Sequence, residues 1–499
     1  MGVLASFGKP YAKRVAKENE KWANNPLDAQ ESVLASLVRQ AKNTVFGKEH
    51  KFLEIKTYSD FQTHVPVRDY EDLKSYVDRI QGGERDVLWP GVPSYFCKTS
   101  GTTSGAKHIP ISKESMRFHL KCAKDAILGY VAETGDSSAL NGGNIFVQGS
   151  PELEEVNNIP IGRLSGISAH HIPWYLQLSN FPSFKTNCID DWEEKLDAII
   201  DETLPKNMTL ISGIPPWVQM YFERIVAQTG KQIKDVFPNF SLLVFGGVAF
   251  DPYRESFKKL IGKEIPSIET YPSSEGFIAY QDSHKEEGML LCVNHGIFFE
   301  FIPANEYFDE SPSRISLKDV KKDVDYALIL NTNAGLWGYS IGDTIRFVST
   351  QPYRIVVSGR IKHFTSAFGE HVIGKEVETA IKTVLKKHSA EVSEFHVAPQ
   401  VSPKEGLPYH EWFVEFQTTP QNSVAFAQAL DTCMQEQNSY YKDLIVGNVL
   451  KPLVVSAVSK TGFINYMKSI GKLGGQNKVP RLANDRKIAD ELTKYTNGE

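Results

Sequence analysis

The sequence has few cysteines, and their positions suggest neither a disulfide framework nor a zinc site. Five cysteines are scattered over 499 residues, at positions 97, 122, 188, 292 and 433, and no two of them form a C-x-x-C pair. Small disulfide-stabilised folds and zinc ribbons are therefore not expected. An odd, dispersed set of thiols is typical of a reducing compartment, so we expect a cytoplasmic protein.

Long apolar runs and an excess of one charge are also missing. The best apolar run, LLVFGGVAF at 242–250, is much shorter than the roughly 20 residues that a membrane-spanning helix needs. The chain carries 55 Lys and Arg against 60 Asp and Glu, a formal net charge of −5, with no basic cluster. Proteins that bind nucleic acid normally carry such a cluster. We therefore expect neither a membrane nor a nucleic acid as partner.

The remaining composition and periodicity predict an α/β protein. With 41% hydrophobic and 23% charged residues, the chain has the composition of an ordinary globular protein. Helical periodicity predicts two helices within 12–46, with Pro26 as a start signal. From residue 95 onward, short β-branched and aromatic runs alternate with helical segments such as 190–204. The alternation predicts a large, multilayer α/β N-terminal domain.

Two segments in the middle of the chain predict paired strands. MLLCVNHGIFFEFI, at 289–302, has the pattern of a β-hairpin that turns near Asn294, His295 and Gly296. YALILNTNAGLWGYSIGDTIRFVS, at 326–349, predicts a second strand pair, because Asn and Gly mark its turns.

The pattern restarts on a smaller scale after Gly359. We predict a helix at about 374–388, strands at HVAPQVS and HEWFVEFQ, a helix at about 422–437 and a last strand at PLVVSAVS. These elements are enough for a small α+β domain. We therefore predict an N-terminal domain of residues 1–358 and a small C-terminal domain of residues 359–499.

The loop KTSGTTSGAKHIPIS, at 98–112, has the composition of a phosphate-binding loop but is not a Walker loop. Glycines free the backbone to approach an anion. A Walker loop requires G-x-x-x-x-G-K-[ST], whereas Ala106 stands at the second Gly and His108 at the hydroxyl residue. We therefore expect any phosphate contact to come from hydroxyls and backbone amides.

Other candidate residues have no partners in the sequence. His170, His171 and His295 have no further ligands at zinc spacing, so we expect core or loop histidines. Cys97 lies beside the loop without an evident activating group, and we assign it no nucleophilic role.

Seven motifs stand in a definite order along the chain. They are 65-VPVRDYEDLKSYVDRIQGGE-84, 99-TSGTTSGAK-107, 212-SGIPPW-217, 271-YPSSEG-276, 339-YSIGDTIRF-347, 359-GRIKHF-364 and 471-GKLGGQNKVPR-481. This order resembles the acyl- and aryl-adenylating enzyme superfamily. More narrowly, the chain is similar to the auxin-responsive promoter family, the acyl-acid amido synthetases of plants and their bacterial relatives.

The resemblance implies a role for the Ser/Thr/Gly loop. Ser100, Thr102 and Thr103 line the phosphates of ATP, and Gly101 and Gly105 allow close approach. The alternative is an ordinary Ser/Thr turn, which is the more common use of such a segment taken alone.

The segment after residue 270 carries the metal candidate. Glu275 follows Ser273 and Ser274 at the end of a predicted strand, so the two serine hydroxyls and the carboxylate share one loop that contacts ATP in this interpretation. A hard carboxylate oxygen beside phosphates suits Mg²⁺. Tyr271 covers one face of the adenine in this interpretation. Alternatively, Tyr271 is a core aromatic and Glu275 a solvated loop acid.

The same resemblance implies further ATP contacts. Gly246 and Gly247 let the backbone lie against the base; otherwise they form a tight strand-to-helix turn. Asp343 accepts hydrogen bonds from the ribose hydroxyls, and Arg360 adds a ribose or phosphate contact. The alternatives are a turn aspartate and an ordinary surface ion pair.

Two lysines belong to the predicted moving parts. The resemblance implies that the small domain is mobile and is joined by a hinge at 359–362. Lys362 stands at the superfamily's hinge position, and Lys478 is the late lysine that enters the site for adenylation and then leaves it. A lysine in such a tail is otherwise simply solvated.

The resemblance therefore implies an enzyme that uses ATP and Mg²⁺ to adenylate a small carboxylic acid and then transfers the acyl group to an amino acid amine. Glu275 and Lys478 are the predicted catalytic residues. The expected state is a monomer or weak homodimer. The alternatives are an acyl-CoA ligase with a thiol acceptor and a catalytically silent nucleotide-binding protein.

Overall fold

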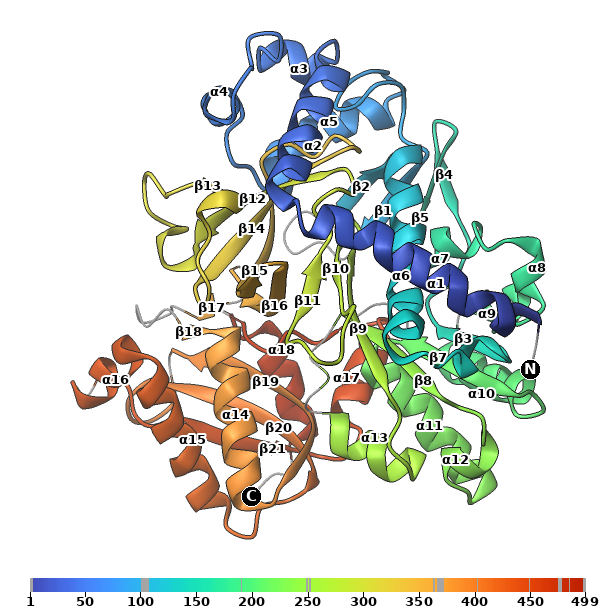
Figure 1. Cartoon of the computed structure of the whole chain (residues 1–499). Helices are drawn as coiled ribbons and strands as arrows, with labels where there is room; N and C mark the ends of the chain where they lie inside the picture. The colour runs from blue at the N-terminus through green and yellow to red at the C-terminus, as the bar shows by residue number, and fades with distance from the viewer. Residues whose placement is uncertain are drawn as a thin grey trace. The chain divides into compact units, whose positions relative to one another are not determined.

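The chain consists of two compact units (Figure 1). The first comprises Met1–Ile341 and Ile345–Val356, and the second comprises Gly342–Thr344 and Val357–Glu499. A computed structural model describes residues 3–99, 107–189, 191–247, 250, 253–361, 364–365, 372–401, 403–447, 449–473, 478–483 and 485–496. The predicted α/β class is confirmed, with a large N-terminal unit and a smaller C-terminal one. The functional boundary at 358/359 and the mobility of the small domain stay predictions.

A large mixed sheet organises the first unit. Among the described residues it has 12 strands in the order β13-β12-β14-β15-β16-β11-β10-β9-β8-β7-β3-β6. Neighbours from β6 to β9 are parallel, whereas β9 to β11 are antiparallel. The strands are β3 (Gly143–Val147), β6 (Asn180–Phe181), β7 (Met208–Gly213), β8 (Leu242–Gly246), β9 (Ser267–Ser273), β10 (Gly276–Tyr280), β11 (Met289–Leu291), β12 (Ile297–Pro303), β13 (Ile315–Ser316), β14 (Asp325–Thr332), β15 (Tyr339–Thr350) and β16 (Tyr353–Arg360).

The predicted hairpin at 289–302 is wrong, although both of its strands exist. β11 lies between β10 and β16, and β12 lies between β13 and β14. β12 pairs along its whole length with β14, from Ile297 opposite Thr332 to Pro303 opposite Tyr326. Buried apolar strands carry no local signal that selects one apolar neighbour over another, so the tertiary structure decides the pairing. The second predicted pair is confirmed, because β14 and β15 are neighbours.

A smaller sheet carries the predicted phosphate loop. Its order is β2 (Lys107–Ile111), β1 (Tyr95–Thr99), β5 (Ile159–Gly162) and β4 (Glu154–Val156). β1 and β2 are antiparallel, with Thr99 opposite Lys107.

Helices cover both sheets. Pro26 begins α2 as predicted, but the segment 12–46 contributes to three helices, and the first of them already begins at Val3. The helices of four residues or more are α1 (Val3–Ala23), α2 (Pro26–Ala41), α3 (Val45–Glu49), α4 (Tyr58–His64), α5 (Tyr70–Gln81), α6 (Lys113–Thr134), α7 (Leu164–Ala169), α8 (Trp174–Gln177), α9 (Phe184–Asn187), α10 (Trp192–Thr203), α11 (Pro215–Thr229), α12 (Ile233–Val236) and α13 (Arg254–Ile261). Within the described ranges, no helix has the length and apolar character needed to cross a membrane.

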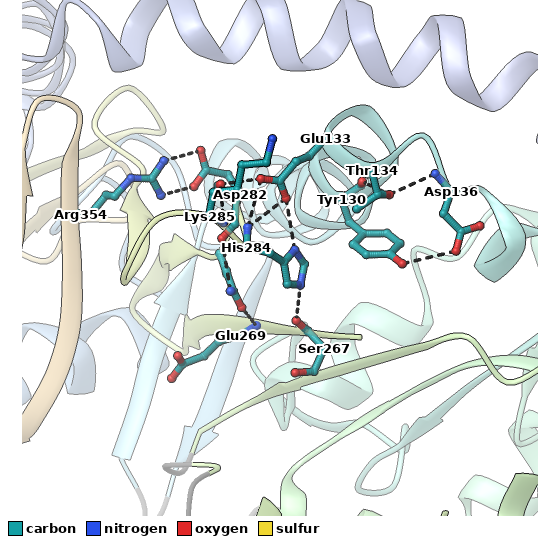
Figure 2. A network of polar contacts seen from close by, with 12 residues as sticks. Tyr130, Glu133, Thr134, Asp136, Ser267, Glu269, Asp282, His284, Lys285 and Arg354 are labelled. Carbon is teal, nitrogen blue, oxygen red and sulfur yellow. Dashed lines mark hydrogen bonds and ion pairs between the residues drawn. The ribbon is translucent and has the colours of Figure 1, made fainter. Parts of the chain in front are cut away.

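The long helix α6 packs between α1 and the central sheet (Figure 1). Its buried Cys122 and Ala126 belong to the same apolar cluster as Ala12 of α1 and Tyr280 of β10. At its C-terminal end, Glu133 accepts hydrogen bonds from Ser283 Oγ at 2.6 Å and His284 N at 2.9 Å (Figure 2). The end of α6 is therefore fixed to the segment that follows β10.

The second unit has the predicted α+β content. β19 (Glu391–Gln400), β20 (Tyr409–Thr418) and β21 (Val454–Val458) form one sheet, and β17 (Phe364–Thr365) pairs with β18 (Val372–Ile373). The predicted helices are confirmed as α14 and α15. The helices are α14 (Gly374–His388), α15 (Ser423–Gln437), α16 (Ser439–Val446), α17 (Gly462–Ser469) and α18 (Lys487–Leu492).

Candidate active site

The strand that leads into the predicted phosphate loop contacts the turn that carries the predicted metal ligand. The thiol of Cys97, on β1, donates a hydrogen bond to Ser274 Oγ at 3.0 Å. Burial raises the pKa of Cys97 to about 12, so this thiol remains a neutral donor at physiological pH. The predicted phosphate ligands themselves lie outside the described residues; they are Ser100, Gly101, Thr102, Thr103 and Gly105.

Tyr70 holds the strand that leaves the same loop. Asp69 and Asp72 form a capping box that starts α5, which makes Tyr70 its first residue. The hydroxyl of Tyr70 accepts a hydrogen bond from the backbone N–H of His108 at 2.8 Å. Its ring centroid lies 5.6 Å from Nζ of Lys107. Both ends of the loop are therefore attached to neighbouring elements.

Glu275 lies half-buried in the turn between β9 and β10. Ser273 closes this turn, because its Oγ donates to Gly276 O at 3.0 Å and accepts from Gly276 N at 3.2 Å. The hydroxyl of Tyr339 lies 3.4 Å from Glu275 Oε1. Burial, reinforced by the charge of Glu275, raises the pKa of Tyr339 well above its ordinary value, so the hydroxyl is the donor.

A fourth segment joins this region through β15. Arg68 N donates to Gly338 O at 2.8 Å, and Ser340 N donates to Arg68 O, also at 2.8 Å. These bonds fix the segment that carries Tyr70 beside Tyr339. The first unit therefore brings together parts of the four segments 65–84, 95–111, 271–276 and 338–340.

The other predicted adenine contacts are well packed. Tyr271 is 7% exposed and belongs to the apolar core, the arrangement that the alternative interpretation describes. Gly246 lies opposite Thr270, and a Cβ there would be 2.4 Å from Thr270 O. A close strand-to-strand approach therefore already requires glycine at 246. Gly247 has φ +81°, in the left-handed region that favours glycine.

In the second unit, the segment with Asp343 lies beside the predicted hinge. The backbone N–H of Ile361 donates to Gly342 O at 2.7 Å, and the hydroxyls of Ser358 and Thr344 are 3.1 Å apart. Asp343 is 7% exposed. Arg360 is the last residue of β16, and the structure describes its backbone only. Lys362 lies outside the described residues.

Lys478 is exposed and precedes a well-anchored segment of the second unit. Val397 N donates to Arg481 O at 2.9 Å, and Nδ1 of His396 lies 2.6 Å from Pro480 O. These contacts attach residues 480 and 481 to β19. The lysine therefore stands two residues from a fixed point.

Sequence reasoning missed three residues of this region. Tyr70 and Tyr339 lie inside segments that carry the family resemblance, so their motifs could have identified them. Arg163 directly follows β5, which runs parallel to β1, and burial lowers the pKa of its guanidinium. Nothing in the local sequence indicates that Arg163 lies near Cys97.

Three consecutive parts of the chain match domains of one family. Residues 15–188 match the GH3 family N-terminal domain, 290–360 the central domain and 375–487 the C-terminal domain. The chain belongs to the GH3 family. Indole-3-acetic acid-amido synthetase GH3.3 of Arabidopsis thaliana is 22% identical over 95% of this chain and 92% of that protein. Jasmonoyl-L-amino acid synthetase JAR4 of Nicotiana attenuata is 21% identical over 67% of this chain and 69% of that protein.

Solved structures share the fold of this GH3 protein. The acyl acid amido synthetase AtGH3.15, in complex with 2,4-DB, superposes with a TM-score of 0.82 at 17% identity, covering 98% of this chain and 96% of that one. A 2-hydroxyisobutyryl-CoA ligase in the postadenylation state has a TM-score of 0.57 at 14% identity, covering 96% and 92%. The chain therefore shares its fold with these two enzymes.

Proposed function

We propose that this GH3 protein is an acyl acid amido synthetase that conjugates a small carboxylic acid to an amino acid. In the first step a carboxylate oxygen attacks the α-phosphorus of ATP, and the bond to the β-phosphate breaks with loss of pyrophosphate. In the second step an amine nitrogen attacks the acyl carbon, AMP leaves, and the amine proton passes to solvent. The amido synthetase relatives and the arrangement around Ser274 support this function.

The Cys97–Ser274 contact is the observation that carries the proposal, because it joins the entry of the Ser/Thr/Gly loop to the turn with Glu275. A phosphoryl-transfer site needs donors and a cation around the same phosphates. The contact supports the proposal that the hydroxyls of residues 100–105 and the carboxylate of Glu275 act on the same bound ATP. Most of the catalysis then consists of holding the carboxylate of the acid substrate in line with the α-phosphorus of ATP.

The residues present fit a magnesium ion. Glu275 supplies one hard carboxylate oxygen, and Mg²⁺ usually takes one or two carboxylates together with substrate oxygens and water. When bound, the ion neutralises phosphate charge. Tyr339, as a hydroxyl donor to Glu275, orients this carboxylate.

Two further roles complete the proposal. Asp343 and Arg360 contact the ribose and phosphates, with Tyr271, Gly246, Gly247, Ser273 and Ser274 around the nucleotide. Residues 1–358 bind ATP and acid, and residues 359–499 turn about Lys362 to bring Lys478 to the phosphates for the first step only. The proposed location is the cytoplasm, and the proposed state is a monomer or weak homodimer.

Acid-dependent exchange of labelled pyrophosphate into ATP tests the first step, with a panel of aryl and alkyl acids. Incubating the active acid with amino acids and, separately, with coenzyme A tests the second, with products identified by mass. An amide with AMP release is expected. A thioester alone would make the protein an acyl-CoA ligase, and ATP binding without exchange across a broad panel would make it a silent nucleotide-binding protein.

A further inference from the structure

Cys122, Cys292 and His295 form a buried cluster that the proposed reaction does not use. Cys122 lies on α6, and the other two lie in the turn between β11 and β12. Both cysteines are 0% exposed and His295 is 2% exposed. One potential ligand atom from each side chain lies within 4.8 Å of the other two. Three groups of the kind that bind soft metal ions therefore share one small space.

The two sulfur atoms have the spacing of a tetrahedral thiolate site. Sγ of Cys122 and Sγ of Cys292 are 3.8 Å apart. Two thiolates that each lie about 2.3 Å from a zinc ion are about 3.8 Å from each other at the tetrahedral angle. A disulfide would need about 2.0 Å, and both cysteines are free. The spacing therefore suits one ion held between the two sulfurs.

The surrounding side chains hold His295 in place. The ring of Trp22 and the ring of Phe118 each meet the imidazole edge-on, with centroids 5.2 Å away. Gln30 braces the same turn, because its Nε2 donates to Val293 O at 2.6 Å and to Ile297 O at 2.8 Å. A fixed ligand pays little entropy when a metal binds.

Two buried polar atoms beside the sulfurs have no hydrogen-bond partner among the described residues. They are Nδ1 of His295 and Oδ1 of Asp125. An unpaired buried polar atom is costly, and a metal ion satisfies it. Asp125 lies one helical turn after Cys122 and is 1% exposed. It therefore lies on the same side of α6 as Cys122.

The ammonium group of Lys121 lies beside this cluster, and its positive charge would repel a bound metal ion. Its Nζ lies 3.3 Å from Nε2 of His295 and forms an ion pair with Asp125. The ion pair offsets the lysine charge, and two thiolates offset the charge of a divalent ion. The side chain of Lys121 is 41% exposed, so its ammonium group can turn toward solvent.

We propose that Cys122, Cys292 and His295 bind one Zn²⁺ ion, which ties α6 to the β11–β12 turn. The donor set of two sulfurs and one imidazole nitrogen suits zinc, and binding releases the two thiol protons to solvent. The site is structural in this inference. It goes beyond the proposed ligase activity and does not depend on it.

Metal analysis of the full-length protein tests the proposal directly. Metal-free protein, prepared with a chelator and reductant, is dialysed against Zn²⁺ and its zinc content is measured by mass spectrometry. About one zinc per chain is expected. Substituting Co²⁺ should give the absorption bands of tetrahedral cobalt thiolate. A chelator should lower the unfolding temperature, and added zinc should restore it.

Matched variants locate the site. Zinc affinity should fall by about 100-fold or more in each of the variants Cys122→Ser, Cys292→Ser and His295→Gln. This loss exceeds the loss of affinity that is typical when a residue outside the ligand set is replaced. The double variant Cys188→Ser/Cys433→Ser removes two cysteines outside the cluster and should keep the full zinc content. The cobalt spectrum of the unaltered chain does not depend on whether any variant folds.

Three outcomes would overturn the proposal. One is less than a tenth of a zinc per chain with no cobalt thiolate bands. Another is zinc lost in the Cys188→Ser/Cys433→Ser variant but kept in Cys122→Ser. The third combines two observations. Protein purified without reductant contains a Cys122–Cys292 disulfide, detected as two missing thiols, and the protein still takes up no metal after that disulfide has been reduced.

Discussion

Cys97 and Ser274 are 177 positions apart in the sequence, yet the Sγ of Cys97 lies 3.0 Å from the Oγ of Ser274. This single contact joins the strand that enters the Ser/Thr/Gly loop to the turn that carries Glu275. In a ligase of the proposed kind, the two segments act on the same ATP, so their relative position should affect nucleotide binding.

Replacing Ser274 by Ala should raise KM for ATP roughly two- to tenfold, because a lost hydrogen bond is worth about 0.5–1.5 kcal/mol. Initial rates against ATP concentration measure it. Cys97→Ser keeps a donor to Ser274 and should have a smaller effect. An unchanged KM for ATP in Ser274→Ala would show that this contact does not set the position of the loop.

Replacing Glu275 by Gln should lower the pyrophosphate exchange rate about 100-fold, because the substitution removes a charged oxygen at the phosphates. The half-maximal Mg²⁺ concentration should rise as well. Glu287→Gln, a change of an exposed acid, is the control. Exchange with normal Mg²⁺ dependence in Glu275→Gln would remove the metal role from this residue.

Replacing Lys478 by Ala should slow adenylation by about 100-fold or more, while aminolysis of a supplied acyl-adenylate changes little. The reason is that its proposed contact exists only in the first step. Exchange kinetics and product formation from the synthetic adenylate separate the two steps. Lys460→Ala, at another exposed lysine of the second unit, should affect neither. Equal loss in both steps would contradict the role.

Replacing Gly246 by Ala should destabilise the protein by about 1–3 kcal/mol, because the new Cβ would meet a backbone oxygen that has no room to move. That oxygen, of Thr270, would be 2.4 Å away. Gly374→Ala is the matched control, since no atom lies within 4 Å of a Cβ there. Denaturant unfolding measures both. Equal stability of the two variants would refute the close approach of β8 to β9.

Replacing Glu133 by Gln should cost about 1–3 kcal/mol of unfolding free energy at pH 7, because hydrogen bonds to a charged acceptor are lost. Burial disfavours the charged carboxylate, but the bonds from Ser283 and His284 outweigh it and lower the pKa of Glu133 below the ordinary 4.5. A lowered pKa stabilises the fold above pH 4.5 and ceases to do so as the pH falls through the folded-state pKa.

The difference between the unaltered chain and Glu133→Gln should therefore shrink below about pH 4.5. Denaturant midpoints from pH 3 to pH 8 measure it, and Glu20→Gln, at an exposed acid on α1, is the control. A difference that stays constant down to pH 3 would contradict the assigned pKa direction.

Local periodicity and motif order determined much of this protein in advance. The α/β class, the helices at 374–388 and 423–437 and the β14–β15 pair follow from residue patterns that span a few turns or one strand pair. The order of the adenylating motifs already indicated the family, because each motif is contiguous in the chain.

Only the tertiary structure decided which distant segments meet. The partners of β11 and β12, the placement of Tyr70 and Tyr339 beside the site, and the meeting of Cys122 with Cys292 and His295 depend on contacts between residues tens to hundreds of positions apart. Such contacts leave no periodicity in the sequence, because apolar strands and single polar residues fit many neighbours equally well until the whole core packs.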